Sequence, residues 1–278
     1  MTRESLARRV WGLRRPRRLA SVVLRRLGLS HLMTIRSSGL RLKFFPTINL
    51  TYLWEDPDFF AIDTDFLRAL LRPGDVMIDC GANIGQLALF GAKCVAPGGI
   101  VYAIEAHPTI FGYLRRHTEM NDAPNVTLIH AAVGEKEGSI NFSDMAADDG
   151  NHVVPSGSGL TVPMHTLDSL IPAGTAVKLL KIDVEGYEKL VFEGAPRVLA
   201  ATECVFFESS SLLFERYGYG CEDVYALLRN AGFTLFRWRG KGIVETLPPG
   251  YASGVATENL VAVRDRDSFL RMTGFTLL

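Results

Sequence analysis

The chain has 278 residues, of which 47% are hydrophobic, enough to bury a full core in one large domain with an extension. Its formal net charge is zero, but residues 1–43 hold 12 Lys and Arg residues against one acid, Glu4, and the remaining 18 basic and 29 acidic residues give about −11. The longest early apolar run, Leu19–Leu24, is too short for a membrane span or a signal peptide. This composition suits a soluble enzyme, and no export signal is expected.

The four cysteines are Cys80, Cys94, Cys204 and Cys221, and none forms a Cys-x-x-Cys pair. They fall within strand-like or helix-like patterns, so neither a zinc site nor a disulfide framework is expected. The pattern favours a reducing, cytoplasmic compartment.

The first 43 residues are predicted to form a basic N-terminal extension, mainly helical, ahead of a domain at residues 44–278. One face of the expected helix is apolar and consists of Leu19, Val22, Val23 and Leu27. An apolar face among arginines is typical of a helix that lies in a membrane interface, so we expect peripheral contact with an anionic membrane at its inner face. The alternative is a solvated arm, or one docked on the acidic body.

After the extension, Phe66, Leu67, Leu70 and Leu71 follow helical spacing, and Pro73 with Gly74 ends that helix. Apolar strands then alternate with helices. The expected elements are a strand at Val76–Asp79, a helix at Ile84–Cys94, a strand at Ile100–Glu105, a helix at Pro108–Asn121 and a strand at Val126–Ala132. This alternation is typical of a parallel, doubly wound sheet.

The second half begins with a short antiparallel insertion and a long loop at Ser143–Leu160, rich in Gly, Ser and Asp. The elements expected after it are a strand at Val177–Asp183, a helix at Tyr187–Glu193, a strand at Cys204–Glu208, a helix at Glu222–Asn230, and strands at Phe233–Trp238 and Asn259–Arg264. The predicted fold class is α/β and Rossmann-like, with a seven-stranded, mostly parallel sheet and an antiparallel edge strand.

The run DVMIDCGANIGQ, residues 75–86, joins the first core strand to a glycine-rich turn. Ligands of open α/β sheets bind outside the carboxyl ends of the strands, which places Asp79–Gly85 at the site. A loop that holds a pyrophosphate offers N–H groups and a helix N-terminus, and a carboxylate such as Asp79 repels that anion. The spacing also lacks the Gly-x-Gly-x-x-Gly pattern. The sequence therefore favours a cationic ligand without phosphate, and S-adenosylmethionine, which carries an ammonium and a sulfonium, meets this requirement.

Glu105 ends the second core strand, 20 residues after Gly85, where a carboxylate can accept hydrogen bonds from both ribose hydroxyls. Enzymes that use NAD also bind the ribose through such a carboxylate. Glu105 therefore indicates a ligand that contains adenosine, and Asp79 is the residue that favours S-adenosylmethionine over NAD. The expected cofactor-binding residues are Asp79, Gly81, Asn83, Gly85 and Glu105. The structural alternative is that Asp79 caps the next helix and Glu105 is solvated.

Four stretches resemble the FkbM-type S-adenosylmethionine-dependent methyltransferases, namely GDVMIDCGANIGQ, IEAHP, HTLDSL and LLKIDVEGYEKLVFEGA. The resemblance spans roughly Leu71 to Glu208, and KIDVEGYE is its most specific part. It implies the seven-stranded Rossmann-like methyltransferase sheet and methylation, typically of a hydroxyl on a sugar or a secondary metabolite. Family members often continue as Glu-Pro after the second strand, whereas here Ala106 and His107 intervene before Pro108 and place an extra histidine beside the pocket.

The period of two in the strand that ends at Asp183 puts Lys181, Asp183 and Glu185 on one side. A hydroxyl that attacks a methyl sulfonium develops positive charge on its oxygen, so a base within about 3 Å removes the proton. Asp183 or Glu185 is the expected base, and among the histidines His165 has the best claim. The alternative is a structural Lys181–Asp183 pair, with Glu185 capping the next helix.

Glu208 ends the following strand, so Asp183, Glu185 and Glu208 together would offer oxygen ligands for Mg²⁺. This interpretation is less favoured than acid–base chemistry, and no metal ligand is assigned.

The function predicted from the sequence is S-adenosylmethionine-dependent methylation of a hydroxyl on a sugar, glycolipid or secondary metabolite. One alternative is an NAD(P)-linked oxidoreductase, against which Asp79 and the missing third glycine both count. The other is a non-catalytic membrane- or nucleic-acid-binding module on the same fold. Specific nucleic-acid binding is not expected, because the basic run Arg14–Arg18 lacks interleaved aromatic residues.

Overall fold

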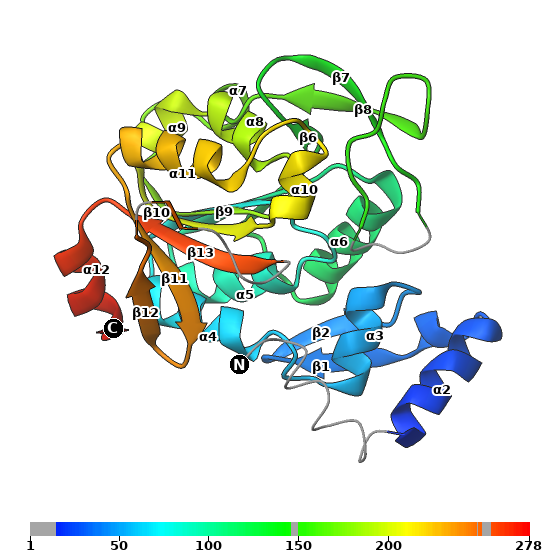
Figure 1. The fold of residues 1–278 in the computed structure, drawn as a ribbon. Coiled ribbons are helices and arrows are strands. Elements are labelled where there is room, and N and C mark those ends of the chain that lie inside the picture. Colours follow the sequence, from blue (N-terminus) through cyan, green and yellow to red (C-terminus); the bar gives the residue numbers. More distant parts are fainter. Residues whose placement is uncertain (1–14, 146–149, 249, 252–256) are drawn as a thin grey trace.

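The computed structural model describes residues 15–145, 150–248, 250–251 and 257–278 (Figure 1). Its centre is a nine-stranded sheet of order β14-β12-β11-β13-β10-β9-β3-β4-β5. The parallel strands are β3 (Val76–Cys80), β4 (Ile100–Glu105), β5 (Val126–His130), β9 (Val177–Ile182) and β10 (Thr202–Ser209). Strand β13 (Glu258–Val263) runs antiparallel between β10 and β11 (Thr234–Gly240). These are the seven strands expected from the sequence, and the Rossmann-like α/β class is confirmed.

Two short strands extend the sheet beyond β11. Strand β12 (Ile243–Thr246) pairs antiparallel with β11, and β14 (Thr276–Leu277) pairs with β12 and forms the edge. The antiparallel edge was expected, but not these strands, because segments of four and two residues are too short to show a period of two.

Helices cover both faces of the sheet (Figure 1). One face packs against α4 (Ala61–Leu70), α5 (Gln86–Val95), α6 (Pro108–Met120) and α12 (Arg266–Thr273). The other packs against α7 (Leu167–Leu170), α8 (Glu188–Glu193), α9 (Pro196–Ala200), α10 (Ser211–Glu215) and α11 (Cys221–Asn230). Neighbouring residues of β3 show this arrangement, because Met77 belongs to the first core and Ile78 to the second. Burial on both faces explains why the parallel strands read as continuous apolar runs.

A small second sheet has the order β6-β8-β7, formed by β6 (Ala132–Val133), β7 (Gly138–Phe142) and β8 (Leu160–His165). The antiparallel insertion expected from the sequence is the β7–β8 pair. The expected long loop lies between these strands, and its residues 146–149 fall outside the described part of the chain.

The N-terminal extension is only partly helical in the described residues. Helix α2 (Arg15–Arg26) and the short helix η1 (Ser30–Leu32) precede a hairpin of β1 (Thr34–Ser37) and β2 (Leu40–Lys43), which α3 (Ile48–Glu55) follows. The hairpin side chains Ile35, Leu40 and Leu42 are buried in the same core as α4 and α5. We therefore propose that the separable part of the extension ends before Thr34 rather than at residue 43.

The hairpin is fixed to the body next to the glycine loop. His117 of α6 is fully buried, its Nδ1 lies 2.7 Å from the carbonyl oxygen of Ile84, and its Nε2 lies 3.0 Å from the backbone nitrogen of Lys43. A neutral ring that donates from Nδ1 and accepts at Nε2 satisfies both contacts. Burial lowers the pKa of His117, which favours this neutral form.

We expect His117→Ala to lower the free energy of unfolding by about 2–4 kcal/mol at pH 8, because it leaves a cavity and two unpaired backbone groups. Since the folded state holds His117 at a lowered pKa, the stability that its neutral ring contributes is present above the ordinary histidine pKa and is lost as the pH falls below it. Urea unfolding at pH 8 and pH 5 measures both effects. His31→Ala, at an exposed position, is the control, and equal midpoints for the two variants would contradict the assignment.

Candidate active site

The site is built on a buried ion pair between two central strands. The register of β3 and β9 places Asp79 opposite Lys181, and Asp79 Oδ1 lies 3.1 Å from Lys181 Nζ. The two side chains are only 1% and 6% exposed. Burial raises the pKa of Asp79, while Lys181 and the N–H of Ala88 in the first turn of α5 act against that rise. Burial disfavours the Lys181 ammonium, but the charges of Asp79 and Asp183 outweigh it, and the pKa of Lys181 is raised.

The expectation that Asp79 presents an open negative charge at the mouth of the loop is corrected by this pair. Asp79 is buried, and its charge is balanced by Lys181. The period of two put Lys181 on the same side of its strand as Asp183. It could not show that Asp79 of β3 is the partner of Lys181, because the pattern of one strand does not reveal which strands lie next to it. Contact between Asp79 and a cofactor remains a prediction.

The loop after β3 uses all its backbone donors internally. The N–H groups of Gly81 and Ala82 donate to Ile104 O, that of Asn83 to Glu105 Oε2, that of Ile84 to Asn83 Oδ1, and that of Gly85 to Ala82 O, at 2.7–3.0 Å. A phosphate-binding loop needs such donors free to face its ligand. With every donor of residues 81–85 engaged, this loop is unsuited to a pyrophosphate.

Gly81 is needed because the loop runs against the end of β9. Its φ is +74°, and a Cβ at this position would lie 1.9 Å from the carbonyl oxygen of Asp183. Gly85, at φ +89°, begins α5, where a Cβ would lie 2.6 Å from Leu114 Cδ1. Both glycines expected from the sequence thus have structural reasons, and Gly81 brings the loop next to Asp183.

Glu105, at the end of β4, is buried and lies beside the loop. Its two carboxylate oxygens accept from the N–H groups of Asn83, at 2.9 Å, and His107, at 2.8 Å. Burial raises the pKa of Glu105 to about 7, although the hydrogen bonds from His107 and Asn83 lower it. The solvated alternative for this acid is therefore wrong.

His107 is also buried and begins α6. Its Nε2 lies 3.2 Å from Asp144 Oδ1, and its Nδ1 is buried with no hydrogen-bond partner among the described residues. An unpartnered polar atom beside Glu105 indicates a position where a ligand can supply the missing hydrogen bond.

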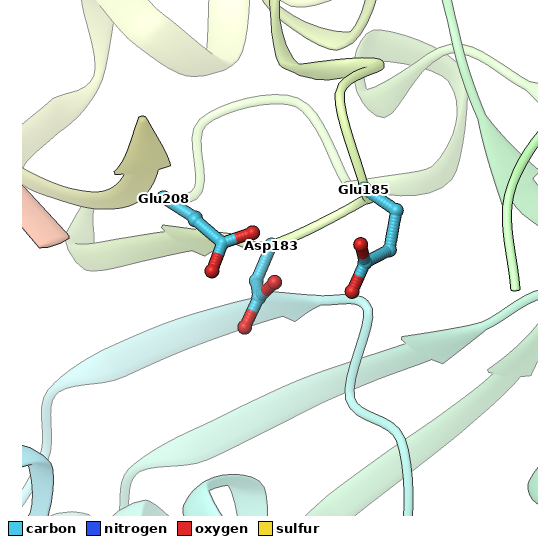
Figure 2. Close-up of side chains that lie close together, drawn as sticks. All are labelled: Asp183, Glu185 and Glu208. Atoms are coloured by element: carbon cyan, nitrogen blue, oxygen red, sulfur yellow. The ribbon is translucent and has the colours of Figure 1, made fainter. Parts of the chain in front are cut away.

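Three further carboxylates meet at the carboxyl ends of β9 and β10. Figure 2 shows the side chains of Asp183, Glu185 and Glu208 close together. One carboxylate oxygen of each lies within 4.8 Å of the others. The Asp183 side chain is 41% exposed, and its Oδ2 lies 3.5 Å from Lys181 Nζ. The convergence expected from the sequence is present, and the Lys181–Asp183 pair of the structural alternative exists beside it.

The turn that presents these acids is held by residues that sequence reasoning missed. Glu185 has a left-handed backbone, φ 56°, and the following Gly186 contacts Leu213. Buried Glu188 accepts from the N–H groups of Val184 and Gly186 and so caps the turn, and burial raises its pKa to about 7. The hydroxyl of Tyr219 also donates to Gly186 O. An acid in the first turn of a predicted helix was the available signal for Glu188.

His165, expected as a second base, lies at the end of β8 in the small sheet. Its Nδ1 is 2.6 Å from Glu137 Oε2, and Glu137 also accepts from Thr166 and Ser169. Hydrogen bonds from Thr166, Ser169 and His165 lower the pKa of Glu137 to about 2. These contacts tie His165 to the start of α7, whereas the three acids belong to the large sheet.

The residues fit S-adenosylmethionine better than a dinucleotide. The backbone N–H groups of residues 81–85 leave no free donor for a phosphate, Glu105 lies beside the loop, and the partly exposed carboxylate next to Gly81 is that of Asp183. The Rossmann-like sheet, with a loop unsuited to phosphate at its carboxyl edge, agrees with the class of S-adenosylmethionine-dependent methyltransferases.

Comparison with known proteins identifies the family. The model of the family described as "Methyltransferase FkbM domain" matches residues 79–235, which is more than half of the chain. The chain therefore belongs to the FkbM methyltransferase family. It is 32% identical over 196 residues to the hexuronic acid methyltransferase AglP of Haloferax volcanii, covering 67% of this chain and 76% of that protein. It is 30% identical to the 31-O-demethyl-FK506 methyltransferase FkbM of Streptomyces tacrolimicus, covering 59% of this chain and 75% of that protein.

Among solved structures, the chain is similar to the methyltransferase FkbM from Methylobacillus flagellatus, with 16% identity and a TM-score of 0.45. That similarity covers 77% of this chain and 53% of the other.

We expect Lys181→Met to lower the free energy of unfolding by about 3–5 kcal/mol, because it leaves Asp79 buried without its partner. The double variant Asp79→Asn with Lys181→Met removes the unpaired charge and should lose less stability than the single variant. Chemical denaturation of the three proteins measures this. A double variant as unstable as Lys181→Met would show that the pair is not the main interaction at this position.

Proposed function

We propose that this chain transfers the methyl group of S-adenosylmethionine to a hydroxyl oxygen of a sugar, glycolipid or secondary metabolite. The observation that carries the proposal is the group of three acids at the carboxyl edge of the sheet (Figure 2). The backbone of Asp183 adjoins Gly81 of the loop, so a cofactor held by the loop and an acceptor held by the acids would meet there.

Each group has a task in this proposal. Glu105 accepts hydrogen bonds from the ribose, and the loop at residues 81–85 lies beside the nucleoside. When bound, S-adenosylmethionine supplies an electrophilic methyl group. Asp183 or Glu185 accepts the proton that the acceptor hydroxyl loses as its oxygen gains the methyl group. Lys181 holds Asp183 from behind, which limits its motion.

The relatives support an oxygen acceptor. The name of one specifies a 31-O position, and that of the other a hexuronic acid, a sugar that carries both hydroxyl and carboxyl groups. A hydroxyl must lose a proton on methylation and needs a base, whereas a carboxylate acceptor has no proton to lose. Three acids at the edge would also repel a carboxylate. The charge of the site therefore favours a hydroxyl.

The same three acids form a set of oxygen ligands of the kind that Mg²⁺ accepts. In that case the metal would bind the acceptor oxygen, and the acids would hold the metal instead of taking the proton. We regard the acid–base role as primary, because Lys181 already supplies a positive charge next to Asp183.

Cofactor binding is expected in the micromolar range, roughly −8 kcal/mol, with no comparable binding of NAD. Since burial raises the pKa of Glu105 to about 7 and the ionised form accepts from both ribose hydroxyls, affinity should rise with pH up to about 7 and then level off. Glu105→Gln should weaken binding at pH 8 by about 1.5–3 kcal/mol and remove this pH dependence.

Calorimetry at pH 6, 7 and 8 measures these affinities, with Glu119→Gln, an exposed acid on α6, as the control. Unchanged affinity and unchanged pH dependence in Glu105→Gln would exclude the ribose contact. Equal affinity for NAD would contradict the assignment of the loop.

Methyl transfer from labelled cofactor to a fractionated cell extract should give a product whose label survives mild alkali, as expected for a methyl ether. Asp183→Asn and Glu185→Gln should leave cofactor affinity within about threefold, and at least one should cut turnover about a hundredfold, the typical effect of losing a general base. Glu193→Gln on α8 is the matched control, because this acid forms a local pair with Lys189 and is not one of the three acids at the edge.

An alkali-labile label would indicate a methyl ester and contradict the hydroxyl acceptor. Full turnover in both acid variants and in their double variant would place the base elsewhere, with His107 and then His165 as the next candidates. Loss of activity on chelation that Mg²⁺ restores would assign the acids as metal ligands. No transfer to any acceptor by a protein that binds the cofactor would favour a non-catalytic module.

A further inference from the structure

Helix α2 and the segment after it expose a concentration of apolar side chains. More than half of the exposed large hydrophobic residues in the described part of the chain lie within residues 19–33. They are Leu19, Val22, Val23, Leu27, Leu29, Leu32 and Met33, and we call them the α2 surface. Leu19 and Leu27 are 68% and 63% exposed, more than most side chains of their kind in a folded protein.

The α2 surface faces away from the body. Helix α2 packs on α3, and on α2 it is the polar Ser21 that is buried, at 1% exposure. Figure 1 shows α2 at the periphery of the molecule, beyond α3. An amphipathic helix of a globular protein normally turns its apolar side inward, whereas here the apolar side of α2 is exposed and has no partner among the described residues.

The charge around this surface is positive. Residues 1–43 contain 12 Lys and Arg residues and one acid, and α2 itself contains none of the acids. Arg26 and Arg36 are exposed within or next to the α2 surface. Apolar side chains among arginines match the two layers of an anionic membrane interface, the acyl chains and the headgroups. A second copy of the chain is a poor partner, because two basic surfaces repel each other. A nucleic acid is a poor partner as well, because it would leave the exposed leucines and valines without apolar contacts.

The α2 surface is attached to the body by a short, firmly packed connection. The hairpin after it belongs to the main core, and Ser37 Oγ accepts from Gln86 Nε2 at 3.1 Å, in the first turn of α5. Lys43 is joined through His117 to Ile84 of the glycine loop. Across the described residues, no helix is both long enough and apolar enough to cross a bilayer. Contact with a membrane would therefore be at its surface.

We propose that the α2 surface docks the enzyme on an anionic lipid bilayer, with Val23, Leu27 and their neighbours among the acyl chains and the arginines on the headgroups. This inference is independent of the methyl acceptor and of the catalytic acids. It adds a membrane partner to a methyltransferase through a surface that the cofactor site does not use.

The experiment is co-sedimentation of the full chain with vesicles of phosphatidylcholine alone and of phosphatidylcholine with phosphatidylglycerol. We expect at least tenfold stronger binding to the anionic vesicles, reduced several-fold at high salt because part of the attraction is electrostatic. Val23→Asp with Leu27→Asp should reduce binding at least tenfold. Leu278→Asp, which changes an equally exposed apolar residue at the other end of the chain, should bind like the wild type.

Circular dichroism and cofactor affinity, unchanged in the double variant, show that it is folded. Binding of the folded double variant at wild-type strength overturns the proposal, as does equal wild-type binding to neutral and anionic vesicles. Sedimentation velocity without lipid measures the oligomeric state and so tests the rival partner, a second copy of the chain. A dimer that the double variant abolishes, without vesicle binding by the wild type, would make a second copy the partner and overturn the membrane assignment.

Discussion

The buried ion pair of Asp79 and Lys181 organises the site. Parallel pairing of β3 and β9 brings the two residues face to face at the point where both strands end. A single buried carboxylate here would be costly, and Lys181 makes it tolerable by placing a positive charge 3.1 Å away. The pair then fixes the relative position of the glycine loop, which follows Asp79, and of the acidic edge, which follows Lys181.

This arrangement explains the choice of ligand in physical terms. Asp79 lies near the end of β3, ahead of α5, and the backbone donors of the loop between them, which would hold a phosphate in a dinucleotide enzyme, are used within the protein. Lys181 contacts Asp183 as well as Asp79, so one ammonium is shared by two carboxylates. A nucleoside that carries positive charge and no phosphate fits both features, in agreement with membership of the FkbM methyltransferase family.

Much of the fold was readable from the sequence because both faces of the parallel sheet are covered. Strand β3 begins with the apolar run Val76–Ile78, and the turn after it shows its glycines. The hairpin of β1 and β2 was missed, since four-residue strands with alternating burial resemble a piece of an amphipathic helix. Its burial depends on α5 and α6, which are distant in sequence.

At the site, the sequence located Asp183, Glu185 and Glu208 because each follows an apolar strand, and strand ends in a parallel sheet share one edge. It misjudged Asp79, since the partner of a buried acid depends on which strands are neighbours. It also missed Glu188, whose role in holding the turn at Gly186 follows from a left-handed residue that periodicity does not reveal. Residue type and spacing therefore identified the carboxylates at this edge of the sheet. The order of the strands, which one sequence does not show, determined which carboxylate is paired with Lys181.

The measurement that tests the central ion pair most directly is the titration of Lys181 by NMR, with the ¹³Cε resonance assigned from Lys181→Arg. If Lys181 is paired with Asp79 and Asp183, it should stay protonated well above the ordinary lysine pKa of about 10.4, and Asp79→Asn should bring its titration down. A Lys181 that titrates at or below about 10.4 in the wild-type protein would contradict this account of the site.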